Sequence, residues 1–409
     1  MQPRVVMLSH ISLLHRALFL FEESIQRERR KRPMTTKKDT QHTQYFWSRV
    51  MQKKLLVAAV SSLIAGQAMA ATVYDDGTNK FEVGGHIGIR VQNQGTADTS
   101  DTTTTGDSSR FNLVASSKLN ESTTAFATGE WGFDVTNTDS DTFSNRLGFV
   151  GAKNDQLGSL SIGKQWSTYS TVAAWTDMFA TVGGEASGLY GEDDAAVGTG
   201  RADDALQYNL SMHGLNVSAQ YQFADSKETT FVTDRQRKNA YALAVSYDLP
   251  MGLSFGVAHN EADFEKTTPE LEKAKATLVG IKYAQGPIYA AATYSLMKNH
   301  ATLDADMGYA DVRFEKAIGT ELYVSYELNE NFKLETGYNE LKNDEDSAGA
   351  DVTNNHLKYF PVGVVYTAGP MQLSATYQYE KGTKNVVVNT VDTKKDVDDK
   401  FVVQARYYF

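Results

Sequence analysis

Five basic side chains on separate stretches of the chain share one feature, since each belongs to a run of alternating polar and apolar residues. They are His86, Arg90, Arg110, Arg146 and Arg201. An extended strand points successive side chains to opposite faces, so each basic group is predicted on the polar face of its strand. Basic groups that line a water-filled passage would hold water, orient polar solutes and attract anions.

The acids that could oppose these basic groups come from one segment, residues 163–201. It reads GKQWSTYSTVAAWTDMFATVGGEASGLYGEDDAAVGTGR and shows no sustained two-residue alternation. Its acids are Asp177, Glu185, Glu192, Asp193 and Asp194. Its apolar residues, which include Trp175, Phe179, Val182 and Tyr190, make it too apolar for a solvated linker. Because long irregular segments of compact domains are often functional, we predict a loop that folds inside a β-barrel and narrows a pore.

The elements that must position these groups are short alternating strands. Sixteen segments fit this pattern: residues 80–92, 109–119, 123–136, 143–152, 159–165, 201–211, 215–224, 238–248, 253–263, 274–284, 288–298, 317–327, 332–341, 356–367, 371–380 and 400–409. Most are about ten residues long, which is the length a tilted strand needs to cross a bilayer. A soluble β-sandwich also alternates, so alternation alone does not separate the two folds.

The connections favour the barrel. Every second connection is tight and contains Gly, Pro or Asn, as in Met212-His213-Gly214 and Gly369-Pro370, whereas the others are mostly long and polar. Tyrosines near many strand ends would supply the aromatic girdles of a membrane barrel. We therefore predict an all-β protein, a 16-stranded antiparallel transmembrane β-barrel with an inward-folded third loop.

The amino end carries an export signal. Residues 51–70, MQKKLLVAAVSSLIAGQAMA, combine two lysines, an apolar run and an Ala-x-Ala site, which indicates a signal peptide cleaved between Ala70 and Ala71. Residues 1–50 precede this signal and are interpreted as a non-native or mis-assigned extension. The mature barrel is then predicted to span residues 71–409.

Charge and composition exclude several classes of function. Residues 1–70 hold 12 of the 40 Lys and Arg and 4 of the 50 Asp and Glu, so residues 71–409 carry a formal net charge of −18. This balance argues against nucleic-acid binding. The chain has no cysteine, which removes disulfides and thiol chemistry. The histidines outside the early strands show no metal-like spacing, so we expect neither a metal nor a cofactor.

Several short motifs together resemble the Gram-negative general diffusion porins of the trimeric type, including the major porins of marine vibrio-like bacteria. The motifs are the mature start Ala71-Thr-Val-Tyr-Asp-Asp-Gly-Thr-Asn-Lys-Phe-Glu-Val, Gly148-Phe-Val-Gly151 after Arg146, Gly158-Ser-Leu-Ser-Ile-Gly-Lys164, Ala174-Trp-Thr-Asp177, Gly183-Gly-Glu185, Gly200-Arg201 and the terminal Tyr-Tyr-Phe409. Their order and spacing cover essentially all of residues 71–409.

The resemblance implies an outer-membrane homotrimer through which ions and small hydrophilic solutes diffuse passively, without catalysis. It places the basic side of a pore constriction on Arg110, Arg146 and Arg201, with His86 at a position where the family often has lysine. The acidic side falls on Asp177 and Glu185, but Thr181 stands where the family has a further acid. Both the basic and the acidic side of the constriction therefore carry less charge than the family implies, and the sequence supports only a weak cation preference.

The resemblance also implies partners in the envelope. Outer-membrane lipid and lipopolysaccharide would surround the barrel, and Phe409 with Tyr407 resembles the signal that the barrel-assembly machinery recognises. From His86 we further predict that its protonation near pH 6 shifts selectivity toward anions.

Two other functions stay open at this stage. A substrate-specific sugar porin would need a track of aromatic side chains through the pore, for which Trp175, Phe179 and Tyr190 are the candidates. An outer-membrane β-barrel hydrolase would need a histidine beside an acid or a serine at one rim, and the histidines of this chain are scattered.

Overall fold

The structure is a computed structural model and describes residues 70–94, 101–136, 143–191, 194–225, 236–265, 273–303, 312–344, 354–388 and 391–409. The extension predicted for residues 1–50 lies outside the described residues, as does the signal peptide up to residue 69, so both stay predictions. No helix in the described ranges is both long enough and apolar enough to cross a membrane.

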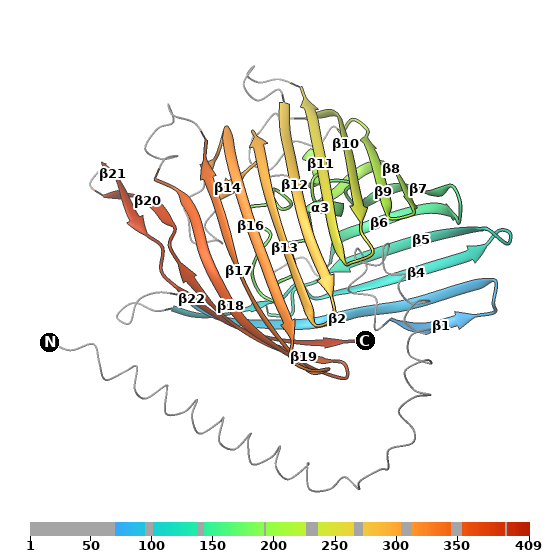
Figure 1. Cartoon of the computed structure of the whole chain (residues 1–409), viewed down its shortest axis with the longest axis horizontal. Helices are drawn as coiled ribbons and strands as arrows, with labels where there is room; N and C mark the ends of the chain where they lie inside the picture. The colour runs from blue at the N-terminus through green and yellow to red at the C-terminus, as the bar shows by residue number, and fades with distance from the viewer. Residues whose placement is uncertain are drawn as a thin grey trace, which may run out of the picture. The chain divides into compact units, whose positions relative to one another are not determined.

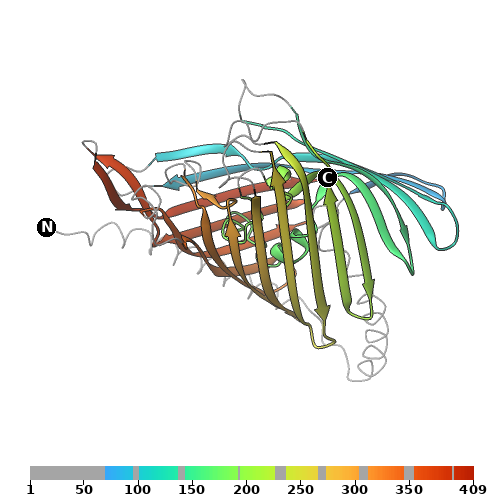
Figure 2. The same ribbon diagram turned by 90° about the horizontal axis from the view of Figure 1, so that it is seen from above.

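Sixteen antiparallel strands form a closed barrel, so the predicted all-β, 16-stranded antiparallel barrel is confirmed. They are β2 (Asn79–Gln94), β4 (Arg110–Lys118), β5 (Thr123–Gly132), β6 (Ser144–Asn154), β7 (Gly158–Trp166), β8 (Arg201–Met212), β9 (Leu215–Gln222), β10 (Arg237–Asp248), β11 (Leu253–Phe264), β12 (Lys273–Gln285), β13 (Ile288–Lys298), β16 (Lys316–Glu327), β17 (Phe332–Asn343), β18 (His356–Ala368), β19 (Met371–Glu380) and β22 (Lys400–Tyr408). Each pairs with the next in this order, and β22 pairs with β2. Figures 1 and 2 show these strands following one another around the wall.

The side chains divide between the two faces of this wall as the alternation predicts. On β12, Val279 and Ile281 are 52% and 42% exposed, whereas Leu278, next to Val279, is fully buried. On β22, Val403 is exposed and Gln404 is buried. A face of exposed apolar residues opposite a face of covered, mostly polar residues suits a barrel with lipid outside and water or protein inside. The sandwich alternative is excluded by the closure of the sheet.

Short and long connections alternate along the chain. Seven tight turns join the strands at one rim, among them His213-Gly214 between β8 and β9. Both residues of this turn have positive φ, at 52° and 86°, which is the backbone of a two-residue hairpin turn with the twist that antiparallel strands need. The opposite rim carries the long connections, of which the third joins β7 to β8.

Within the described residues, eight short elements were not predicted. They are β1 (Ala71–Asp75), β3 (Asp101–Gly106), β14 (Thr302–Leu303), β15 (Val312–Arg313), β20 (Thr383–Val388), β21 (Val391–Asp396), α3 (Ser170–Ala173) and α4 (Asp194–Val197). Most lie in connections where no apolar alternation marks them. β1 forms a hairpin with the start of β2, and β20 and β21 form a hairpin beyond the rim.

The barrel closes at the carboxyl end. Phe409 and Gly85 exchange both backbone hydrogen bonds, each 3.0 Å long. Gly85 has a φ of 159°, and a Cβ added there would lie 2.3 Å from the Arg110 carbonyl oxygen. A glycine is therefore needed where β2, β4 and the last residue of the chain meet.

Candidate functional site

The connection between β7 and β8, residues 167–200, is tied to the wall at both of its ends. The Ser167 amide donates to the Gly200 carbonyl at 2.8 Å, so the two ends of the connection lie side by side. The Thr168 hydroxyl contacts the Ser218 hydroxyl of β9 at 2.7 Å. The short helix α3 follows and contacts β10, β11 and β12, behind which it lies in Figure 1.

The middle of this connection is held by a buried carboxylate on the far wall. One oxygen of Glu321, on β16, accepts hydrogen bonds from the backbone amides of Ala186 at 2.8 Å and Ser187 at 2.9 Å. The other oxygen accepts the Thr176 hydroxyl. Glu321 is buried on the face opposite the exposed Leu322. Three groups of the connection therefore converge on one inner-face acid, which lies 134 to 145 residues later in the chain.

Further contacts reach the strands that close the barrel. The Ala180 amide donates to Glu335 of β17 at 3.0 Å, and the Ala180 carbonyl accepts from Gln404 of β22 at 3.0 Å. The Thr181 hydroxyl donates to Thr376 of β19 at 2.7 Å. All three wall partners are buried inner-face residues. Thr181, which stands where the resemblance implies an acid, thus acts as a neutral contact to the wall.

Trp175 is a packing residue of this connection. Its ring fills the space over Gly256 and Gly280, where an added Cβ would lie 2.7 Å and 3.1 Å from ring carbons. The Tyr289 hydroxyl donates to the Trp175 carbonyl at 2.8 Å, and the Lys282 ammonium lies 4.8 Å from the ring centroid. Because the ring is buried against β11 and β12, it presents little surface to a passing solute.

Three of the predicted arginines gather around Glu130 of β5. The Arg146 Nε donates to the Glu130 carboxylate at 2.7 Å, and the Arg110 guanidinium lies 3.6 Å from the same oxygen. Arg201 has Arg146, Glu130 and Asp194 as its charged neighbours. One buried acid thus serves a cluster of three cations, which leaves a net positive charge at this place on the wall.

A β-bulge produces the position of Arg146. Glu130 pairs with Leu147 while Trp131 pairs with Asn145, so Arg146 has no cross-strand partner. Cross-strand partners share a face, so Leu147 lies on the inner face with Glu130. Strict alternation along residues 143–152 would place Leu147 opposite Arg146, and that expectation is therefore wrong. The bulge lets two consecutive side chains, Arg146 and Leu147, turn to the same side.

In β8 the alternation used to predict the face of Arg201 is also interrupted. Gln165 pairs with Ala202 and Gly163 pairs with Ala205, so Ala202 and Ala205 share a face across an irregularity in β8. Counting alternate residues back from Ala205 therefore does not predict the face on which Arg201 lies. Its charged neighbours, rather than its parity, put Arg201 in the cluster.

Arg90 belongs to a separate ion pair. The Asp107 carboxylate is fully covered, accepts from Arg90 at 3.1 Å and accepts a second charged hydrogen bond from Arg406. His86 is buried beside this group, with its ring centroid 5.3 Å from that of Tyr408 and with Arg110, Arg406 and Asp107 as charged neighbours. Glu130, Asp107 and Arg406 were not predicted as site residues. For Glu130 and Arg406 the signal was present, because both lie on the polar face of a predicted strand.

The two acids predicted for the opposite side lie close to each other. The Tyr190 hydroxyl donates to Asp177 at 2.7 Å, and the Tyr359 hydroxyl donates to Glu185. Burial, opposed by the hydrogen bond from Tyr190 and reinforced by the Glu185 carboxylate, raises the pKa of Asp177 to about 6. Tyr190 also has Arg201 and Arg146 as charged neighbours. This tyrosine therefore lies between the acids and the arginine cluster.

Of the remaining predicted acids, Asp194 lies beside Arg201 at the edge of the arginine cluster. Glu192 and Asp193 lie outside the described residues. Asp194 begins α4, and its carboxylate accepts the backbone amide of Arg201 at 3.2 Å. The Asp194 carbonyl also accepts the amide of Gly198 at 2.9 Å, so Asp194 holds the end of the connection against β8.

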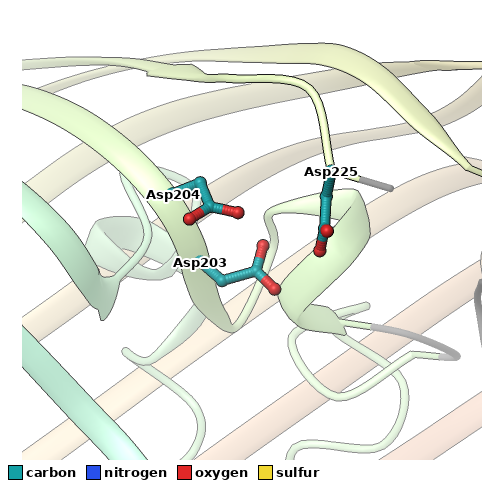
Figure 3. A group of neighbouring side chains, drawn as sticks. All are labelled: Asp203, Asp204 and Asp225. Carbon is teal, nitrogen blue, oxygen red and sulfur yellow. The ribbon is translucent and has the colours of Figure 1, made fainter. Parts of the chain in front are cut away.

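A second acidic group lies near the long-connection rim, where Figure 3 shows Asp203, Asp204 and Asp225 close together. The buried guanidinium of Arg237 donates to Asp203 at 2.6 Å and to Asp204 at 3.2 Å. An internal cation therefore already neutralises two of these carboxylates, and the group ties β8 to β10.

Comparison with known proteins identifies the family. The family model described as Gram-negative porin matches residues 56–315 and 279–409. The chain belongs to the Gram-negative porin family. It is 26% identical over 340 residues to outer membrane porin F of Xenorhabdus nematophila, covering 77% of this chain and 89% of that protein. It is also 26% identical over 371 residues to porin-like protein L of Photobacterium profundum, covering 88% and 100%.

The solved structures agree with the fold. The Salmonella typhi OmpF complex with daunomycin superposes with a TM-score of 0.68 at 20% identity, covering 83% of this chain and 100% of that one. The trimer form of OmpT of Vibrio cholerae gives 0.58 at 18% identity, covering 81% and 100%. The protein is thus an outer-membrane porin, and porins are channel proteins rather than enzymes. The hydrolase alternative is therefore set aside.

Proposed function

We propose that residues 167–200 fold into the barrel as the third loop and form the pore constriction. The observation that carries this proposal is the convergence of Thr176, Ala186 and Ser187 on Glu321. A buried inner-face carboxylate can accept hydrogen bonds only from groups that lie within the barrel. The arginine cluster then lies on the barrel wall at one side of the constriction, and Asp177 and Glu185 lie on the loop at the other side.

This arrangement suits passive diffusion of ions and small hydrophilic solutes. Opposite charges across a narrow passage orient water, so an apolar solute would have to displace well-solvated charges. Glu130 and Asp107 offset part of the positive wall, and residues 71–409 carry a net charge of −18. Both features support a weak cation preference.

General diffusion is favoured over a specific sugar channel by the packing of the candidate aromatic track. Trp175 is buried against β11 and β12, and Phe179 stacks edge-on to the buried Tyr323 at 4.6 Å between ring centroids. Only Tyr190 of the three candidates keeps an exposed ring. A sugar track needs a series of exposed ring faces, which these side chains do not offer.

The partners of this function follow from the family and the barrel. We propose that the protein works as a homotrimer after cleavage between Ala70 and Ala71. It would be inserted by the barrel-assembly machinery through a signal that includes Phe409 and Tyr407. Outer-membrane lipid and lipopolysaccharide would then cover the exposed apolar face.

The absence of cysteine allows a direct test of the loop. Single-channel currents of Asp177→Cys trimers would be recorded in a planar bilayer before and after a cationic thiol-specific reagent is added. We expect openings in groups of three and a stepwise fall in conductance as each subunit reacts. Asn120→Cys, in a tight turn at the opposite rim, serves as the control and should keep its conductance.

Two results would contradict the proposal. An unchanged conductance of fully labelled Asp177→Cys would place the loop away from the ion path. A silent bilayer with correctly folded protein would refute the pore function itself.

A further inference from the structure

The connection between β13 and β16 buries apolar side chains at an open rim of the barrel. The structure describes residues 299–303 and 312–315 of this connection. Ala301, Leu303, Val312 and Phe314 are all buried, and Leu303 and Phe314 are fully covered. A connection that extended into water would leave such side chains exposed, at a cost that grows with their apolar area. Other parts of the protein must therefore cover them.

The covering side chains belong to the inside of the barrel. The four apolar residues share one buried cluster with Leu341 of β17, Leu357 of β18 and Leu189 of the connection between β7 and β8. Leu341 and Leu357 are direct cross-strand partners, and Leu341 lies on the same face of β17 as the inner-face residue Glu335. The described ends of the β13–β16 connection therefore fold inward at the mouth of the barrel.

A short hairpin gives these ends two different faces. β14 and β15 pair Thr302 with Arg313 and Leu303 with Val312. Cross-strand partners share a face and successive residues alternate, so the four apolar side chains lie on one face and Thr302 and Arg313 lie on the other. Arg313 keeps part of its surface exposed. The hairpin thus presents a basic side chain on the face away from the apolar cluster.

His300 joins this connection to the connection between β7 and β8. Its ring is fully buried, and its Nε2 lies 2.7 Å from the Gly188 carbonyl oxygen and 3.1 Å from the Thr199 hydroxyl. A carbonyl oxygen only accepts, so Nε2 carries the hydrogen of the bond to Gly188. Gly191 packs against the ring, because a Cβ added there would lie 2.4 Å from the ring carbon Cε1. One side chain therefore contacts three points of the proposed third loop.

We propose that the β13–β16 connection is a second inward-folded loop, which holds the third loop in place through His300 and narrows the mouth of the pore in series with the constriction. His300 is a positioning residue that acts through Gly188 and Thr199. Pore diameter is a main determinant of selectivity, and two narrow places in series select by size more sharply than one. The inference rests on the proposed third loop and adds a specificity-determining element to it.

The test of His300 compares two replacements in single trimers in a planar bilayer. H300F keeps a ring in the buried site but cannot donate to Gly188, whereas H300Q keeps an N–H donor. Leaving a buried carbonyl without its donor shifts a two-state equilibrium about tenfold, so brief current fluctuations of H300F should occupy ~10-fold more of the recording than those of wild type. H300Q should stay near wild type. The matched control H356F replaces the outer-face His356 near the same rim and should also behave as wild type.

A cysteine on the hairpin tests whether the hairpin narrows the mouth. The chain has no cysteine, so R313C can be labelled alone with a cationic thiol-specific reagent, which restores the charge and adds bulk. Conductance should fall stepwise as each subunit reacts, and in liposomes the uptake of a trisaccharide should fall more than that of a monosaccharide. The control D392C lies on the hairpin of β20 and β21, which extends beyond the rim in Figure 1, and should keep its conductance.

Three results would overturn the inference. Fluctuations of H300F equal to those of wild type would show that His300 does not position the third loop, and fluctuations of H300Q equal to those of H300F would show that its hydrogen bond does not. An unchanged conductance of fully labelled R313C would place the hairpin away from the solute path, and this arm decides alone if H300F does not assemble. The proposed constriction is tested separately, because D177C should still lose conductance on labelling in each of these cases.

Discussion

Replacing Glu130 by glutamine should shift the ion selectivity of the porin toward anions. Glu130 is the acid within the arginine cluster, at 2.7 Å from Arg146 and 3.6 Å from Arg110. Glutamine keeps the size of the side chain and an acceptor oxygen for Arg146. The substitution therefore removes one negative charge and leaves three guanidinium groups to act on the permeating ions.

The size of the shift follows from Coulomb's law. A unit charge about 6 Å from a permeating ion in water contributes about 0.7 kcal/mol, with opposite sign for a cation and an anion. The cation-to-anion difference is then about 1.4 kcal/mol, and screening at 0.1 M salt reduces it to about 0.8 kcal/mol. The permeability ratio should therefore fall about fourfold at 0.1 M salt, and by less than about twofold at 1 M salt.

The assay is the zero-current potential of reconstituted trimers across a salt gradient. It would be measured once at a mean salt concentration of about 0.1 M and once at about 1 M. Glu82→Gln is the matched control, because Glu82 lies on the same face of β2 as His86 but four residues earlier. This spacing puts Glu82 about 13 Å from His86 along the strand, which is more than one screening length at 0.1 M salt. The zero-current potential of E82Q should therefore differ little from that of wild type. A shift of E130Q that equals that of E82Q, or one that persists at 1 M salt, would refute the assignment of Glu130 to the ion path.

Two further perturbations test the loop. The pKa of Asp177 is raised to about 6, so lowering the pH from 7 to 5 should protonate its carboxylate and weaken the cation preference. The variant D177N should show the low-pH selectivity already at pH 7 and should not change further with pH. If H86A loses the pH dependence instead, the titrating group is His86, as the sequence suggested. Glu321→Ala leaves the amides of Ala186 and Ser187 without their acceptor, and each unsatisfied buried group costs about 1–3 kcal/mol, so we expect a lower thermal transition and larger conductance fluctuations. The outer-face variant Glu340→Ala is its control, and a quiet, wild-type-like channel in E321A would show that this carboxylate does not hold the loop.

The sequence by itself determined the barrel. A strand that separates lipid from an aqueous or protein-filled interior must alternate apolar and polar residues, and tight turns need residues such as the His213-Gly214 pair. Both signals are local, so the sixteen strands and the seven tight turns could be predicted to within a few residues. The polar faces that hold Arg110, Glu130 and Arg406 follow from the same alternation.

Only the tertiary structure decided how the site is assembled. The bulge at Arg146 and the irregularity in β8 interrupt the two-residue period, so counting along the strand misplaces Leu147 and does not establish the face of Arg201. Glu321, which holds the middle of the connection, lies 145 residues after its partner Thr176, and no local pattern marks such a pair. Alternation is a property of one strand, whereas charge compensation is a property of several strands and the loop together.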